Sequence, residues 1–199
     1  MTRFDRTCVW LTRILIAGMV GYGLGHAVAG NLKYARYIIA GALIVILVTY
    51  FARHMFGLIP SWLVLFMATF MVLGSCFGFG YGMYGKWWPW DDLMHAISGV
   101  VFGFFGVVLV EHMCNEWAPR PPVWARVMIA MLFACFIALM WELYEFGSDL
   151  YFGTFFQQND LYDTMIDLFY GALWGLITAS GYYFVKKRFP HLVKELSRK

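Results

Sequence analysis

Charged residues are scarce in this chain of 199 residues: they make up 14% of it, against about 25% in an average soluble domain. Hydrophobic residues make up 61% and lie in long, unbroken runs. A water-soluble globular domain does not have this composition. The sequence therefore indicates a protein whose apolar residues face lipid as well as a core.

Paired cysteines and the common catalytic motifs are also missing. The net charge is only +3 and the basic residues form no stripe, which excludes nucleic-acid binding. Neither a Gly-x-Ser-x-Gly elbow nor a His-Glu-x-x-His helix occurs, so the commonest hydrolase signatures are absent. The cysteines stand singly, without a C-x-x-C pair, and predict neither a zinc ribbon nor a disulfide framework: Cys8, Cys76, Cys114 and Cys135.

Long apolar runs are what the sequence does contain. Six of them reach about 20 residues, the length at which an α-helix crosses a bilayer, and they lack the alternation of a membrane β-barrel. We expect an all-α, polytopic six-helix transmembrane bundle that forms one domain over residues 1–199. Glycines between Gly74 and Gly85 predict an irregular end to the third span. The expected spans are residues 9–29, 35–52, 58–79, 92–112, 124–147 and 165–185.

Six spans place both ends of the chain on one side of the membrane. Twelve of the 15 lysines and arginines then share that side, and only Lys33, Arg36 and Lys86 fall opposite. Because basic segments stay in the cytoplasm, we expect both termini to be cytoplasmic and the protein to lie in the cell inner (plasma) membrane. The N-terminal residues up to Ala29 also resemble a cleavable signal peptide, and cleavage there would leave the other five spans unchanged.

Eight of the 12 acidic residues fall on the outer side, and their spacing forms pairs. Residues three or four apart share a helix face. Small residues continue these faces into the membrane, where they allow helix backbones to approach closely, so we expect the acidic helix ends to converge. The pairs are Asp92 with His95, Glu142 with Glu145, and Asp163 with Asp167; the small residues are Gly99, Gly103, Gly106, Ala134, Ala138, Gly171 and Gly175.

Acids inside a span are costly unless a partner offsets their charge. A metal ion, shared protons or a cationic substrate group would each do so. Oxygen and imidazole ligands suit a divalent ion such as Mg²⁺, Mn²⁺, Zn²⁺ or iron. The candidate metal ligands are Asp92, His95, Glu142 and Asp167; the candidate catalytic bases are Glu145 and Asp163; His26 and Gln157 are candidates to complete the cluster.

Simpler interpretations exist for single members of this cluster. Asp91 and Asp163 also fit helix caps or first-turn acids that favour the helix dipole. His95 alone also fits a hydrogen-bonded packing residue. The segment from Tyr151 to Phe156 is either part of an interfacial aromatic belt or an amphipathic lid over the acids.

The residues from Trp90 to Gly99, followed by Trp141-Glu142-Leu143-Tyr144-Glu145, Gln157 and Asp163 to Leu168, resemble the YjdF-like family of bacterial inner-membrane proteins. The order Asp-x-x-His, Glu, Gln, Asp-x-x-x-Asp-Leu is also distantly similar to VanZ-like proteins, which are associated with resistance to a glycopeptide antibiotic. VanZ-like proteins tend to carry an arginine between the glutamine and the aspartates, and this chain has none there. The resemblance covers residues 85–180 and implies no particular reaction.

Three classes of function fit these features. The first is a metal-assisted enzyme that acts on a lipid or lipid-linked substrate at the outer leaflet. The second is a cation- or proton-coupled transporter, although the acids gather at one face without a relay through spans two and three. The third is a non-catalytic accessory or binding protein of the envelope. Di-iron oxidation is disfavoured because only one helix carries an acid-x-x-His step.

Overall fold

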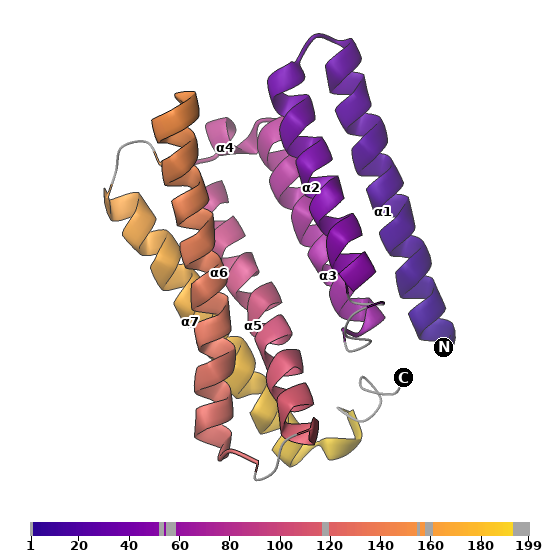
Figure 1. Cartoon of the computed structure of the whole chain (residues 1–199), viewed down its shortest axis with the longest axis vertical. Coiled ribbons are helices and arrows are strands. Elements are labelled where there is room, and N and C mark those ends of the chain that lie inside the picture. Colours follow the sequence, from indigo (N-terminus) through magenta and orange to yellow (C-terminus); the bar gives the residue numbers. More distant parts are fainter. Residues whose placement is uncertain are drawn as a thin grey trace. The chain divides into compact units, whose positions relative to one another are not determined.

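The computed structural model describes residues 2–51, 54, 59–116, 120–154, 156–157 and 161–192, and over these it is an all-α protein. Six helical segments are long and apolar enough to cross a membrane, which confirms the expected fold class (Figure 1). Several of these helices are longer than the apolar runs, because helical turns with polar residues extend them at their ends. The elements are α1 (Arg3–Val28), α2 (Leu32–Phe51), α3 (Ser61–Met71) with its π-helical continuation η2 (Val72–Gly80), the short α4 (Met83–Lys86), α5 (Trp90–Glu116), α6 (Val123–Phe152) and α7 (Leu161–Arg188).

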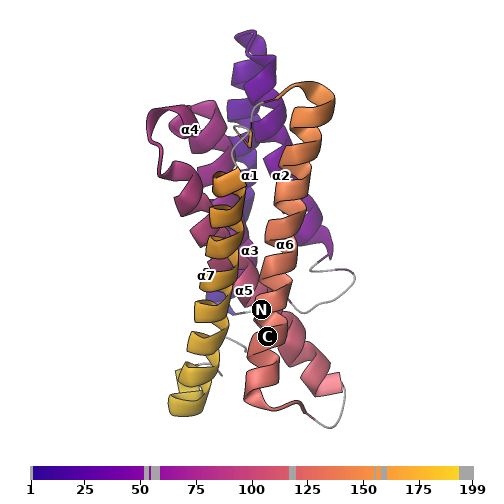
Figure 2. The same cartoon turned by 90° about the vertical axis from the view of Figure 1, so that its left-hand side faces the viewer.

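The described residues fall into two compact units, one ending at Trp90 and one beginning at Asp91. In the first unit α1, α2 and α3 pack against one another. In the second, α6 and α7 lie side by side, as Figures 1 and 2 both show, and α5 contacts both of them. The expectation of one domain over the whole chain stays a prediction.

Polar contacts fix the start of the first unit. The Thr2 hydroxyl accepts the backbone N–H of Asp5, and the Asp5 carboxylate accepts the backbone N–H of Thr2. The Ser61 hydroxyl donates to the same carboxylate at 2.7 Å. These bonds join the first turns of α1 and α3 and explain why α1 begins several residues before its apolar run.

The third span changes from an α-helix to a π-helix at Val72. The glycines predicted an irregular end here, and the structure confirms it. Aromatic rings occupy the space that side chains would need: a β-carbon on Gly78 would collide with the Tyr84 ring, and one on Gly80 would lie 2.6 Å from a ring atom of Tyr22. The glycines therefore serve packing within the first unit.

In the second unit, α5 touches its neighbours through glycine. A β-carbon built on Gly99 would lie 2.8 Å from the backbone oxygen of Gly171 in α7, and one on Gly106 would lie 2.5 Å from that of Ala130 in α6. The helix backbones are therefore in direct contact, as small residues allow in lipid.

Small residues also join α6 to α7. A β-carbon on Gly171 would lie 2.8 Å from the methyl group of Ala138, and one on Gly175 would lie 2.7 Å from that of Ala134. The close helix approach expected from the sequence is thus confirmed for α5, α6 and α7. We call these contacts the small-residue seam.

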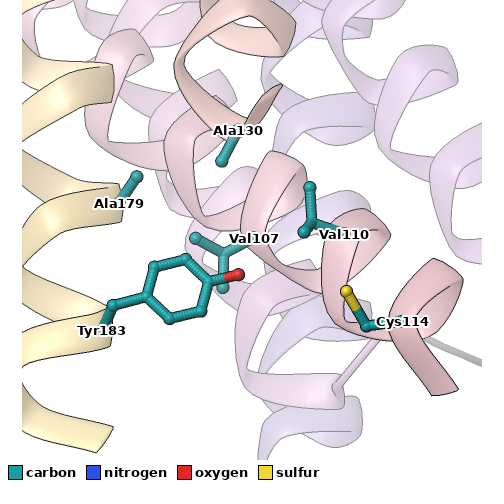
Figure 3. Packing of buried hydrophobic residues seen from close by; sticks show 6 residues of the cluster. All are labelled: Val107, Val110, Cys114, Ala130, Ala179 and Tyr183. Carbon is teal, nitrogen blue, oxygen red and sulfur yellow. The ribbon is translucent and has the colours of Figure 1, made fainter. Parts of the chain in front are cut away.

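Beyond the seam, apolar side chains fill the space between the same three helices. Tyr183 of α7 lies near the α5 side chains in Figure 3 and is 5% exposed. This cluster closes the end of the unit away from the acids predicted to form a site. Its buried members are Val107, Val110, Cys114, Ala130, Ala179 and Tyr183.

The seam predicts a contrast between two glycine-to-alanine substitutions. Gly106→Ala should destabilise the protein by about 1–3 kcal/mol, because its new methyl group meets backbone atoms. Gly181→Ala, on an open part of α7, should be neutral or stabilising by up to about 1 kcal/mol. Thermal unfolding of both variants in one detergent measures the difference, and equal midpoints would refute close packing at Gly106.

Candidate metal centre

His95 lies at the centre of an acidic cluster. Its imidazole is buried in α5, and three carboxylate oxygens surround its Nε2 atom: Asp91 Oδ1 at 3.7 Å, Glu142 Oε1 at 3.8 Å and Asp167 Oδ2 at 3.7 Å. These distances are equal within 0.1 Å and too long for hydrogen bonds. The imidazole is therefore bonded to none of the three and faces all of them.

The small-residue seam explains this convergence. Four residues advance an α-helix by about one turn along the same face. Each of the three side chains stands one such turn from a residue of the seam, so the backbone contacts aim them at one point. The pairs are His95 with Gly99, Asp167 with Gly171, and Glu142 with Ala138.

Two oxygens of the cluster are buried without a partner. Glu142 Oε1 and Asp167 Oδ1 accept no hydrogen bond from any residue that the structure describes. Within that same set of residues, the ion pairs of lysine and arginine all go to Glu111, and none goes to these carboxylates. Buried ionised carboxylates without a partner carry a large desolvation cost, which either a bound cation or protonation of the carboxylates would offset.

The ligand atoms of Asp91, His95 and Asp167 lie within 4.8 Å of one another, a group able to hold a metal ion. Two ligands of one Zn²⁺ or Mg²⁺ ion lie about 3–3.6 Å apart, given ligand distances near 2.0–2.2 Å. Binding an ion would therefore bring the most widely separated ligand atoms closer by about 1–2 Å. Glu142 is not part of this group, but its Oε1 atom lies 3.8 Å from His95 Nε2.

Asp91, and not its neighbour Asp92, faces His95. From the sequence, Asp92 was the expected metal ligand, and Asp91 also fitted a helix cap or a first-turn acid. In the structure α5 begins at Trp90, so Asp91 stands in its first turn, four residues from His95. That i, i+4 spacing was the signal that identifies Asp91. Asp92 is half-buried, and its role as a ligand stays a prediction.

The two candidate bases lie beside the cluster. Glu145 is buried in α6 and accepts a hydrogen bond from Trp141 Nε1 at 2.8 Å. Asp163 is half-buried in the first turn of α7. Both carboxylates are close enough to Asp91 and Glu142 to interact with them electrostatically. Their position fits a base next to a metal-bound group, and that role stays a prediction.

Of the two residues predicted to complete the cluster, Gln157 does so. Its side-chain amide donates to Glu142 Oε2 and to the Glu142 backbone oxygen, both at 3.3 Å. His26 lies in the first unit, where its ring packs against Tyr22 and Tyr34.

Comparison with known proteins assigns the chain to a family. The model of a family described as "Predicted membrane protein (DUF2238)" matches residues 7–188. The chain belongs to this family. Membership and the six apolar helices make it a multi-pass membrane protein.

The DUF2238 match spans every residue of the candidate metal centre. A relative from Thermotoga maritima, named "Uncharacterized protein", is 28% identical over 129 residues, which are 65% of this chain and 65% of the relative. The chain thus covers about two thirds of that relative's length. No solved structure matches the chain.

At the other end of the second unit, this DUF2238 member has an acidic residue that is paired with basic residues. Glu111 of α5 pairs with Arg126 of α6 at 3.2 Å and with Lys186 of α7. The Arg126 guanidinium also lies 4.8 Å above the centre of the Tyr183 ring. The sequence analysis missed this group, because its members are far apart in the chain.

These two environments predict opposite effects of removing a carboxylate charge from chelator-treated protein. Asp167→Asn should raise the unfolding midpoint by about 2–4 °C, because it relieves repulsion among buried acids at a gain of about 1 kcal/mol. Glu111→Gln should lower it by at least as much, because it leaves two cations unpaired. Thermal unfolding in detergent tests both, and a lower midpoint for Asp167→Asn would show that a cation offsets the charge of these carboxylates.

Proposed function

We propose that the cluster around His95 binds a divalent metal ion and that the protein is a metal-assisted enzyme acting on a lipid or lipid-linked molecule. One observation carries the proposal: three carboxylate oxygens face a single imidazole nitrogen. One of them, Glu142 Oε1, is buried without a hydrogen-bond partner among the described residues, and so is Asp167 Oδ1. A metal ion offsets the charge and satisfies these atoms together.

The ligand set limits the chemistry. One imidazole with carboxylates suits Mn²⁺, Zn²⁺ or iron, and Mg²⁺ if carboxylates dominate. An ion there would polarise a phosphoryl or ester oxygen. Glu145 or Asp163 would then act as general base toward a water molecule or hydroxyl group. This division of roles keeps the ligands and the base on different side chains.

The location of the ligand candidates on membrane-spanning helices suggests the class of substrate. All ligand candidates lie on helices long and apolar enough to span a bilayer. His95 and Asp167 are within about two turns of the start of α5 and α7, and Glu142 is about three turns before the end of α6. Aromatic side chains stand beside them on α6, where the rings of Trp141 and Tyr144 lie 5.5 Å apart. Such rings prefer the level of lipid headgroups. A headgroup ester or phosphate would thus reach the cluster from the membrane surface.

Orientation and compartment complete the proposal. The bias of basic residues supports cytoplasmic termini in a bacterial inner membrane, with the cluster at the outer face. The likeness to YjdF-like and VanZ-like proteins supports an envelope role for the site. A cation- or proton-coupled transporter and a non-catalytic accessory protein are the competing functions. Uptake into proteoliposomes driven by an ion gradient would favour the transporter, and metal binding without turnover would favour the accessory protein.

Metal binding is the first test. Purified full-length protein should bind about one Mn²⁺ or Zn²⁺ ion per chain, and His95→Ala and Glu142→Gln should weaken binding by at least about 100-fold because each removes a ligand. Calorimetry and elemental analysis measure affinity and stoichiometry. Wild-type protein that binds none of Mg²⁺, Mn²⁺, Zn²⁺ or Fe²⁺ would refute the metal centre.

Asp91→Asn and Asp92→Asn form a matched pair for the same assay. Both remove one carboxylate charge from the first turn of α5. We expect Asp91→Asn to weaken binding at least about tenfold more than Asp92→Asn, because only Asp91 faces His95. The reverse order would support the assignment made from the sequence.

Orientation has its own test. A C-terminal fusion to green fluorescent protein should fluoresce, and a fusion to alkaline phosphatase should be inactive, because the proposed C-terminus is cytoplasmic. The same reporters inserted in the segment between α6 and α7 should give the reverse result: an active phosphatase and no fluorescence. Active phosphatase at the C-terminus would place the cluster on the cytoplasmic side.

A further inference from the structure

The chain turns back on itself after α6, and one carboxylate holds the turn. Gly153 ends the helix in the left-handed conformation, at φ +61°. Asp149, in the last turns of α6, then accepts three hydrogen bonds: from the Thr154 hydroxyl at 2.5 Å, the Phe156 backbone N–H at 2.8 Å and the Gln157 backbone N–H at 3.0 Å. Both Asp149 oxygens are thus occupied, so Asp149 is not a free metal ligand.

This turn places the Gln157 side chain next to the candidate metal centre. Asp149 stands about two helical turns beyond Glu142 on α6. With its backbone held by Asp149, Gln157 reaches back along the helix and donates to Glu142 Oε2. The other oxygen, Oε1, is left without a partner among the described residues and faces His95.

We propose that Asp149 is a positioning residue of the metal centre, which acts through Gln157 to orient the Glu142 carboxylate. The inference rests on the proposed function. Carboxylates that bind metals are themselves held by hydrogen bonds, and removing such a bond costs 10- to 100-fold in affinity. Here the amide of Gln157 engages one oxygen and so presents the other to the ion.

A double-mutant cycle on the full-length protein tests this chain of contacts. Asp149→Asn and Gln157→Ala should each weaken Mn²⁺ binding about tenfold or more, although neither residue is a ligand. If Asp149 acts through Gln157, the double variant should bind no more weakly than the weaker single variant. Multiplied losses in the double variant, or an unchanged affinity in Asp149→Asn, would overturn the proposal. Gln157→Ala changes no charge, so its loss separates positioning from long-range electrostatics.

Hydrogen exchange supplies a second reading that needs no metal. The amides of Phe156 and Gln157 should exchange slowly in the wild-type protein and faster in Asp149→Asn, because both donate to Asp149. Equal exchange in the two proteins would overturn the role of Asp149 even if metal binds. If the Asp149→Asn variant loses this protection but the wild-type protein binds no metal, the proposed function is refuted. The hydrogen bonds between Asp149 and the turn would still be supported.

Discussion

Direct contact between helix backbones is the constraint on which the second unit depends. Gly99 and Gly106 of α5 have no space for a β-carbon, so α5 lies against α6 and α7 without a layer of side chains between them. In lipid, where apolar side chains gain little by leaving their surroundings, such close packing replaces the hydrophobic effect as the attraction between helices. The same contact brings ionisable side chains one turn away within 3.8 Å of His95. Packing and site therefore have one origin.

The two ends of this unit handle buried charge in opposite ways. Glu111 is paired with Arg126 and Lys186, and its ion pairs link α5, α6 and α7. The cluster around His95 gathers carboxylates without a cation from the described residues. Like-charge groups that are held together cost stability, and proteins keep them chiefly where function needs them. The end around Glu111 therefore stabilises the fold, whereas the end around His95 is suited to chemistry.

Much of this arrangement could be predicted from the sequence, because its signals are local. The length of the apolar runs predicted the spans, and glycine spacing predicted the seam. The choice between Asp91 and Asp92 could not be predicted in this way: adjacent residues differ by about 100° around a helix, and packing at Gly99 sets that rotation. The contact of Glu111 with Lys186 joins residues 75 apart and has no local pattern. Two of the three hydrogen bonds to Asp149 come from backbone N–H groups, which every sequence contains.

The placement of His95 Nε2 has a consequence for protons. That nitrogen cannot hold a hydrogen atom and a metal ion at the same time, so it would bind an ion only in the neutral form of the ring with the hydrogen on Nδ1. Carboxylic acids around it must likewise lose their hydrogens before they coordinate. Capture of a cation and release of protons are thus one equilibrium at this cluster. Occupancy of the proposed metal site would then depend on the proton concentration on the side of the membrane that the cluster faces, as well as on the supply of metal.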